Sequence, residues 1–140
     1  MARKPTNLAT RFLRAARVRR DDADALLDAG RTAGAVYLAG YGVECGLKAL
    51  ILAQVPAGPR QTRVVDDEFC GRNAHSFSWL LTLGRRYNAP APPAEVARSL
   101  TAVGDWTTDL RYEPTPYHPE SDDFFAAVAV IMDWVEKRLN

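Results

Sequence analysis

The feature that most constrains this chain is a nearly continuous apolar segment, Ala35–Ile51, that carries one acid and one base. Few faces of such a segment tolerate water, so as a helix it belongs at the centre of a helical bundle. Glu44 and Lys48 lie one helical turn apart within it. An exposed pair at this spacing stabilises a helix by only about 0.2–0.5 kcal/mol, which does not explain two charges in a buried segment. The pair therefore either extends to the rim of the bundle, or faces a cleft or a partner chain.

Length and composition indicate one soluble domain that needs no metal or disulfide to fold. The chain has 140 residues, of which 47% are hydrophobic and 25% charged, and we expect residues 1–6 to form a flexible tail. Cys45 and Cys70 belong to no Cys-x-x-Cys pair, so no zinc site is expected. Glu44 and Lys48 interrupt the longest apolar run before it reaches the roughly 18 residues of a membrane span. No signal core follows the basic N-terminus, so we expect a cytoplasmic protein with no membrane contact.

Apolar residues recur at helical spacing in five segments, and no segment shows the alternation of a strand. Gly30 and Pro56 are typical of the ends of the first two helices. The predicted helices span approximately Thr6–Ala29, Thr32–Gln54, Ala74–Gly84, Pro93–Trp106 and Glu120–Leu139. A long loop over 56–73 and an irregular segment over 107–119 connect them, and Asp21-Asp22 is a candidate break in the first helix. The fold class is therefore all-α, an antiparallel bundle of four or five helices.

The small net charge of +1 conceals a basic N-terminal run. Residues 1–20 contain no acid, and their bases are Arg3, Lys4, Arg11, Arg14, Arg17, Arg19 and Arg20. Further arginines occur in the middle of the chain, at positions 60, 63, 72, 85 and 86. The run is either a solvated helix face or a surface for an anionic partner, most simply a nucleic-acid backbone.

The two histidines are the candidate proton-transfer groups, and each has an arginine upstream. Arg111 precedes His118 with six residues between them. An arginine holds a phosphate through two parallel hydrogen bonds, so this pair is a minimal set for RNA cleavage without a metal. The alternative is structural: Trp106 and Tyr112 seal the end of the bundle, and Arg111 pairs with an acid.

Arg72 precedes His75 by only three positions, and here a structural role is the stronger reading. Ser76 or Asn73 caps the following helix, and His75 makes a structural hydrogen bond in its first turn. The nearby acids at 66–68 are consecutive and lack the spacing of metal ligands, so we expect neither a metal nor a cofactor. A small-molecule site lined by Tyr37, Tyr41 and Trp134 is a further alternative to plain core packing.

Three groups of residues together resemble the HEPN family (higher eukaryotes and prokaryotes nucleotide-binding domain). The first is Ala39-Gly-Tyr-Gly-Val-Glu-Cys-Gly-Leu-Lys-Ala-Leu50. The second is a histidine that opens a short helix, His75-Ser-Phe-Ser-Trp-Leu-Leu81. The third is Trp106 with Arg111-Tyr112 before a final amphipathic helix. The similarity extends over roughly Leu8 to Leu139.

The resemblance implies an all-α bundle that forms homodimers. Many members are ribonucleases of toxin–antitoxin or other prokaryotic defence systems, with an arginine, four to six residues and then a histidine as the active motif. It assigns catalysis to Arg111 and His118, supported by Glu44, which would orient Arg111 or a histidine. Residues then expected to bind RNA or a nucleotide are Lys48, Arg72, His75, Trp106 and Tyr112.

Two functional hypotheses follow from the resemblance. The first is a metal-independent endoribonuclease or an RNA- or nucleotide-binding protein, with an antitoxin as its partner. The second is a non-catalytic module that acts through a homodimer or a partner such as a nucleotidyltransferase. The enzyme hypothesis requires Arg111 and His118 to reach one phosphate, since both must approach it by hydrogen bonding.

Overall fold

A computed structural model describes residues 7–112 and 121–139 of the chain, which form six α-helices and two short 3₁₀ helices. The α-helices are α1 (Leu8–Asp28), α2 (Thr32–Leu52), α3 (Pro59–Glu68), α4 (Phe77–Arg86), α5 (Ala94–Ala102) and α6 (Ser121–Leu139). The 3₁₀ helices are η1 (Arg72–His75) and η2 (Thr108–Tyr112). The described residues contain no strand, so the predicted all-α class is confirmed.

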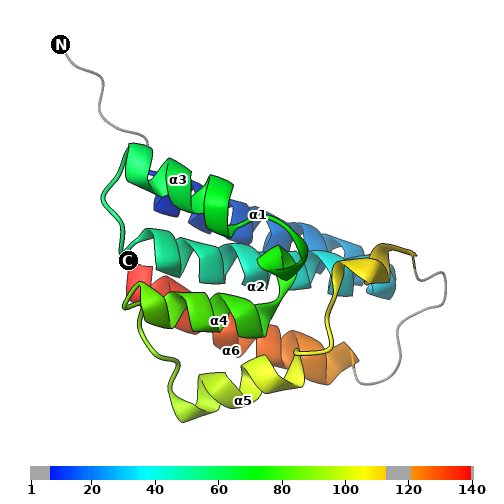
Figure 1. The fold of residues 1–140 in the computed structure, drawn as a ribbon. Coiled ribbons are helices and arrows are strands. Elements are labelled where there is room, and N and C mark those ends of the chain that lie inside the picture. The colour runs from blue at the N-terminus through cyan, green and yellow to red at the C-terminus, as the bar shows by residue number, and fades with distance from the viewer. Residues whose placement is uncertain (1–6, 113–120, 140) are drawn as a thin grey trace.

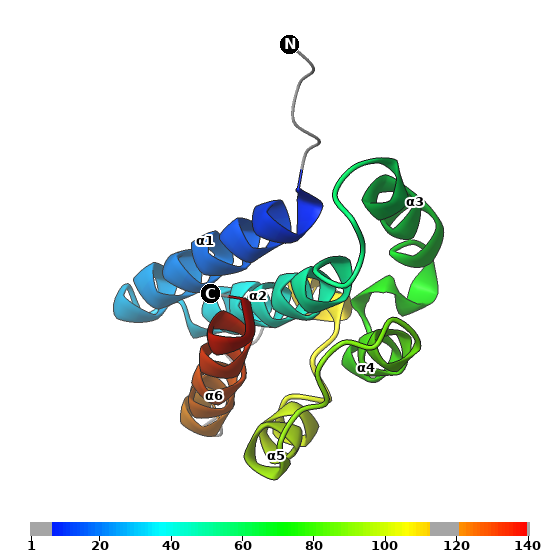
Figure 2. The same cartoon turned by 90° about the vertical axis from the view of Figure 1, so that its left-hand side faces the viewer.

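Helix α2 occupies the centre of the bundle, as its apolar sequence predicts. Helix α1 packs along one side of α2, while α4 and α6 contact it from other sides and α5 packs on α6 (Figures 1 and 2). Fourteen of the residues of α2 are buried, and they include Glu44 and Lys48. A helix enclosed on nearly every face can present polar groups only to a cavity or to buried partners.

The ends of the first helices follow their local sequence. The side chain of Asn7 accepts hydrogen bonds from the backbone N–H groups of Ala9 and Thr10, at 3.1 and 3.4 Å, and begins α1. Gly30, with φ of 76°, supplies the left-handed turn after α1. Helix α1 continues through Asp21 and Asp22, so the candidate break there is wrong.

Two further boundaries correct the sequence-based prediction. The predicted loop over 56–73 contains α3 and the start of η1, and the predicted helix over Ala74–Gly84 is divided between η1 and α4. The predicted helix that reaches Trp106 ends at Ala102. The predicted four or five helices are therefore six α-helices in the described residues.

Helix α2 is, by length and composition, the one helix of the described residues that is apolar enough to cross a membrane. Its two charges do not prevent this, contrary to the sequence-based argument. In the structure 78% of the apolar window is buried inside the protein, as in the core helix of a bundle.

Candidate functional site

A row of four polar or aromatic side chains runs along one face of α2. Their positions differ in turn by four, three and four, which is the spacing of one helical face. The four residues are Tyr37, Tyr41, Glu44 and Lys48. The two tyrosines are half-buried, whereas Glu44 and Lys48 are only 4% and 6% exposed. This face, which we call the polar row, is where the core helix meets η1 and η2.

Glu44 is the centre of the polar row because each of its oxygens has a charged or polar partner. Its Oε2 lies 2.9 Å from Nζ of Lys48, and its Oε1 lies 2.7 Å from Nδ1 of His75. The Lys48 ammonium also lies 5.2 Å from the ring centroid of Phe69. A buried charge is tolerated only when it is paired and hydrogen-bonded. The pair therefore does not extend to the rim but forms a buried array with a histidine.

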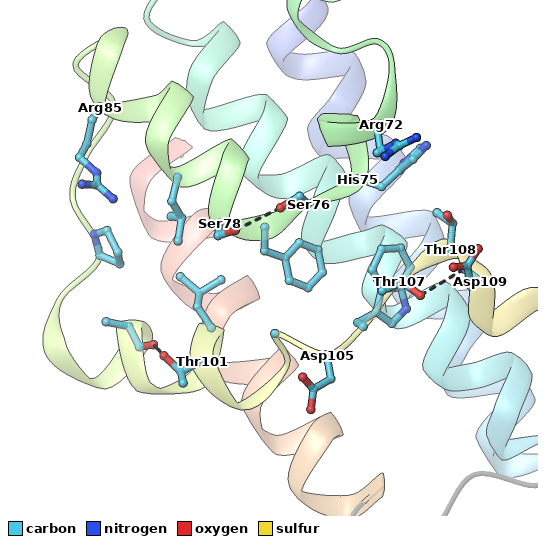
Figure 3. Close-up of a pocket in the computed structure, with 17 residues that line it drawn as sticks. Arg72, His75, Ser76, Ser78, Arg85, Thr101, Asp105, Thr107, Thr108 and Asp109 are labelled. Atoms are coloured by element: carbon cyan, nitrogen blue, oxygen red, sulfur yellow. Dashed lines mark hydrogen bonds between the residues drawn. The ribbon is translucent and has the colours of Figure 1, made fainter.

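His75 is presented by η1 beside Arg72. A 3₁₀ helix has three residues per turn, so side chains at i and i+3 lie on the same side. Figure 3 shows the Arg72 and His75 side chains next to one another. The predicted cap by Ser76 is confirmed, since its Oγ accepts from the Trp79 backbone N–H at 3.3 Å. The predicted hydrogen bond of His75 is the one to Glu44.

The contact with Glu44 determines which ring nitrogen of His75 is available. A carboxylate only accepts hydrogen bonds, so Nδ1 of His75 carries a hydrogen and donates it to Glu44. In the neutral imidazole, Nε2 is then the proton acceptor. The His75 side chain is 42% exposed, so one end of the ring is buried on Glu44 while the ring still reaches solvent.

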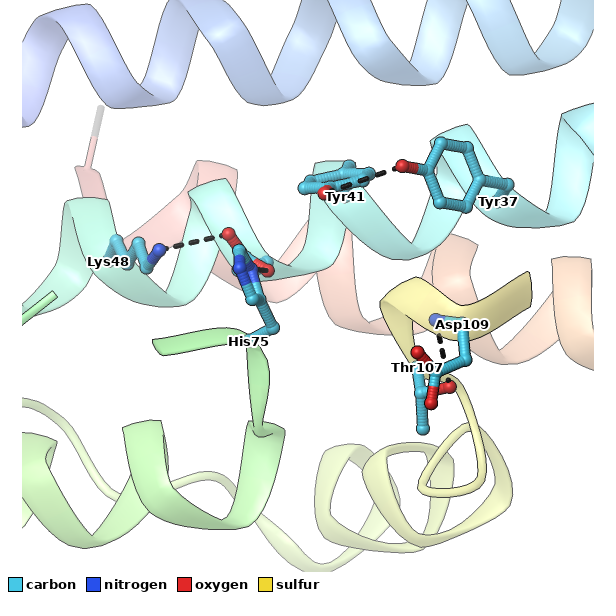
Figure 4. A network of polar contacts seen from close by, with 7 residues as sticks. Tyr37, Tyr41, Lys48, His75, Thr107 and Asp109 are labelled. Atoms are coloured by element: carbon cyan, nitrogen blue, oxygen red, sulfur yellow. Dashed lines mark hydrogen bonds and ion pairs between the residues drawn. The ribbon is translucent and has the colours of Figure 1, made fainter. Parts of the chain in front are cut away.

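Tyr41 contacts both His75 and Tyr37, its neighbour in the polar row (Figure 4). Its ring meets His75 edge-on, with 6.0 Å between centroids, and its hydroxyl lies 3.4 Å from that of Tyr37. Burial, and then the hydrogen bond with Tyr37, raise the pKa of Tyr41 to about 12. The Tyr41 hydroxyl therefore remains protonated at every pH near neutrality.

Trp106 closes the polar row from the segment before η2. Its ring stacks on Phe77, with centroids 5.3 Å apart and planes at 5°, and meets Tyr41 edge-on at 5.3 Å. The indole lies directly on Gly40, where a Cβ would come within 2.0 Å of its Nε1 and Cε2. Trp106 is thus buried at the bundle end, as the structural alternative predicts, and only a glycine at position 40 leaves room for it.

A cavity of about 940 Å³ opens beside His75, between η1, α4, α5 and the segment that leads into η2 (Figure 3). Its arginine, histidine and aspartate lining residues are Arg72, His75, Arg85, Asp105 and Asp109. Its hydroxyl groups come from Ser76, Ser78, Thr101, Thr107 and Thr108. Cations, hydroxyls and an apolar floor in one cavity suit a ligand with anionic and sugar-like groups.

The structure places the predicted pair of Arg111 and His118 only in part. Arg111 lies on η2, 4.7 Å above the ring of Tyr112, and does not line the cavity. Hydrogen bonds with the side chains of Tyr112 and Tyr37 raise the pKa of Arg111. Tyr112 is 72% exposed and does not seal the bundle. His118 lies outside the described residues, so this pair stays a prediction.

The predicted small-molecule site of Tyr37, Tyr41 and Trp134 is wrong. The two tyrosines face Trp106 and η1, whereas Trp134 lines a separate apolar cavity of about 190 Å³ with residues that include Leu47 and Ile51. Within residues 7–112 and 121–139, no group of three or more His, Cys, Asp or Glu side chains is placed to hold a metal ion.

Three arginines of the basic N-terminal run form ion pairs. Arg17 makes two hydrogen bonds of 2.6 Å to Glu136 of α6, Arg19 pairs with Asp22 at 3.0 Å, and Arg20 lies 3.8 Å from Asp133. The contact of Arg17 joins α1 to α6. These three arginines therefore pair with acids of the same chain. This agrees better with a solvated helix face than with a surface for an anionic partner.

Sequence reasoning missed that the two tyrosines share a face with Glu44 and Lys48. The spacing of four, three and four residues was present in the sequence and is the signal that identifies the row. No sequence signal assigned Glu44 to His75 rather than to Arg111, because 31 residues separate the two.

Comparisons of the chain with protein-family models, with curated proteins and with solved structures found no match. The resemblance to the HEPN family therefore rests on the sequence motifs, and the function must be argued from the site.

Proposed function

We propose that this chain is a HEPN-like RNA-binding protein that cleaves RNA without a metal, with the reaction centred on His75 and the adjoining cavity. The expected homodimer, and an antitoxin or nucleotidyltransferase as a partner, belong to the same proposal. The observation that carries it is the 2.7 Å contact between Nδ1 of His75 and the buried carboxylate of Glu44. A histidine held in one tautomer by a buried acid is a typical general base.

The proposed reaction uses three groups of the site. Nε2 of His75 takes the proton from a ribose 2′-hydroxyl, whose oxygen then attacks the adjacent phosphorus. Arg72, on the same side of η1, stabilises the charge that develops on the phosphate oxygens. The bond to the 5′-oxygen breaks, this oxygen takes a proton from solvent, and the products are a 2′,3′-cyclic phosphate and a 5′-hydroxyl. Glu44 holds the ring and stabilises the imidazolium that forms.

This assignment moves the centre of the reaction relative to the sequence-based prediction. Arg111 contacts Tyr37 of the polar row but does not line the cavity, whereas Arg72 and His75 both line it. Glu44 keeps its predicted supporting role, now toward His75. Lys48 holds the second oxygen of Glu44 and is buried, so it supports the array and does not bind phosphate directly.

RNA cleavage by the purified chain in EDTA tests the proposal. His75→Ala is expected to lower the cleavage rate by about 10²–10⁴-fold, the usual contribution of a general base. Arg72→Gln is expected to lower it by about 10–100-fold, since a charged hydrogen bond contributes roughly 1.5–3 kcal/mol. Arg98→Gln is the matched control, because Arg98 is exposed on α5 and does not line the cavity.

Substitutions at Arg111 and His118 test the alternative catalytic site. Cleavage that is lost in His118→Ala and Arg111→Gln, but kept in His75→Ala, would place the centre at the predicted Arg111–His118 pair. Absence of cleavage by the wild type on several unstructured RNAs would favour the non-catalytic module.

A further inference from the structure

We infer that Arg85 is a second phosphate anchor, so that the cavity takes an RNA strand with at least two phosphates rather than a mononucleotide. The inference rests on the proposed function, because it assumes that one phosphate binds at Arg72 and His75. It adds a binding residue at the far end of the same cavity.

The basic side chains of the cavity lining lie in two places. Arg72 and His75 lie on η1, just before α4, whereas Arg85 lies in the last turn of α4. Arg85 lies nine positions after Ser76, which is about 14 Å along an α-helix at about 1.5 Å per residue. Figure 3 shows Arg85 at the opposite end of the lining from Arg72 and His75. One phosphate cannot contact both ends.

This separation matches a short strand. Successive phosphates of a stacked strand are about 3.4 Å apart along its axis, so about 14 Å corresponds to roughly four stacked nucleotides and to fewer extended ones. The cavity volume of about 940 Å³ lies toward the upper end of small-ligand pockets and is open to solvent.

Arg85 is available for a ligand, and its neighbour Arg86 is not. Arg85 is exposed, lines the cavity and forms no ion pair with any described residue. The guanidinium of Arg86 instead lies 5.1 Å from the ring centroid of Trp79 and does not line the cavity. Two consecutive arginines thus differ in whether the side chain lines the cavity.

Two carboxylates, Asp105 and Asp109, also line the cavity. A carboxylate repels a phosphate but accepts hydrogen bonds from a ribose hydroxyl, so these two groups suit the sugars of a bound strand. The phosphates of the strand then bind at the two arginine positions.

Binding of a non-cleavable RNA tests the inference. The probes are uridine monophosphate and a fluorescent 2′-O-methyl hexauridylate, whose blocked 2′-oxygen cannot attack phosphorus. Arg85→Gln is expected to weaken hexamer binding about tenfold or more, and to reduce the slope of log K against log salt by about 0.7. It should leave mononucleotide binding unchanged. Arg86→Gln should change neither, and Arg72→Gln should weaken both.

The outcomes separate the two proposals. Hexamer binding that falls in Arg72→Gln but is equal in Arg85→Gln and Arg86→Gln would overturn the second anchor and leave the proposed function intact. Equal loss of mononucleotide and hexamer binding in Arg85→Gln would also overturn it. Failure of the wild type to bind or cleave RNA would remove both.

Discussion

At the scale of single residues, the closest packing in the site is the indole of Trp106 on Gly40. Every other residue type would place its Cβ within 2.0 Å of that ring. Trp106 also stacks on Phe77 and lines the cavity, so its position determines both the polar row and one cavity wall.

Gly40→Ala is therefore expected to expel Trp106 from its place on α2. We expect a loss of about 1–3 kcal/mol in the free energy of unfolding, the usual result of overpacking, and a red shift of the tryptophan emission. Gly34→Ala is the control, because its Cβ meets only Cδ1 of Leu26, at 3.3 Å, and alanine is favoured in helices. Urea unfolding followed by fluorescence measures both; equal stability of the two variants would contradict the packing argument.

The predictability of the site also differs from residue to residue. Two charges on an apolar helix correctly indicated a special environment at Glu44 and Lys48. The partner of Glu44 was not predictable, because contacts between η1 and α2 depend on how α3 and η1 return the chain across the core. The pairing within the polar row depended only on helical spacing and was present in the sequence.

At the scale of elements, a buried amide of α3 joins this helix to the ends of α1 and α2. Gln61 is 1% exposed, and its Oε1 accepts from the backbone N–H of Leu8 at 2.7 Å. Its Nε2 donates to the carbonyls of Leu52 at 3.0 Å and Val55 at 3.2 Å. One side chain thus bonds the first N–H of α1, the last carbonyl of α2 and the Val55 carbonyl that follows α2, and so joins the ends of two helices.

Gln61→Ala should remove this partner from the Leu8 N–H and the Val55 carbonyl, whereas the Leu52 carbonyl keeps the bond of 3.0 Å from the Val55 N–H. An unsatisfied buried group costs about 1–3 kcal/mol, so we expect a loss of about 2–4 kcal/mol in the free energy of unfolding. Gln54→Ala is the matched control, because exposed Gln54 makes only one hydrogen bond, of 3.4 Å, to Leu50, and we expect a change below about 0.5 kcal/mol. Equal effects of the two substitutions in urea titrations would show that Gln61 does not join the helices.

Helices that carry an apolar stripe were predictable from the sequence. Helix α3, which carries none, was not predicted. Helices α1, α2 and α6 were predicted to within a few residues, because their buried residues repeat at helical spacing. Helix α3 buries only Gln61 and Val64, so its sequence has no such stripe. Pro59 at its first turn was a start signal, and a structureless loop of this length was itself an improbable prediction.

At the scale of the whole molecule, the pH dependence of stability depends on two weakly acidic groups of α2, the Cys45 thiol and the Tyr41 hydroxyl. Burial, with a smaller contribution from Glu44, raises the pKa of the Cys45 thiol to about 11, and burial raises that of Tyr41 to about 12. The folded state therefore favours their neutral forms. The stabilisation is complete below their unfolded pKa values of about 9 and 10, and is lost as pH rises through the folded values.

We accordingly expect the free energy of unfolding to fall progressively between pH 9 and about pH 12. Urea unfolding at intervals of half a pH unit measures this fall. The variant Cys45→Ala/Tyr41→Phe should show a shallower decline over the same interval, since it has neither group to ionise. A wild-type profile that is flat to pH 12 would contradict the raised pKa values.

The array of Lys48, Glu44 and His75 also restricts how such a chain can diverge over evolutionary time. Loss of one partner of a buried ion pair destabilises a protein by about 3–5 kcal/mol, whereas an apolar replacement of the whole set is often neutral. A domain with a total stability of about 5–15 kcal/mol tolerates few such intermediates. Descendants of this chain should therefore keep the three residues or exchange them together, and a lineage that loses all three should show an entirely apolar core helix.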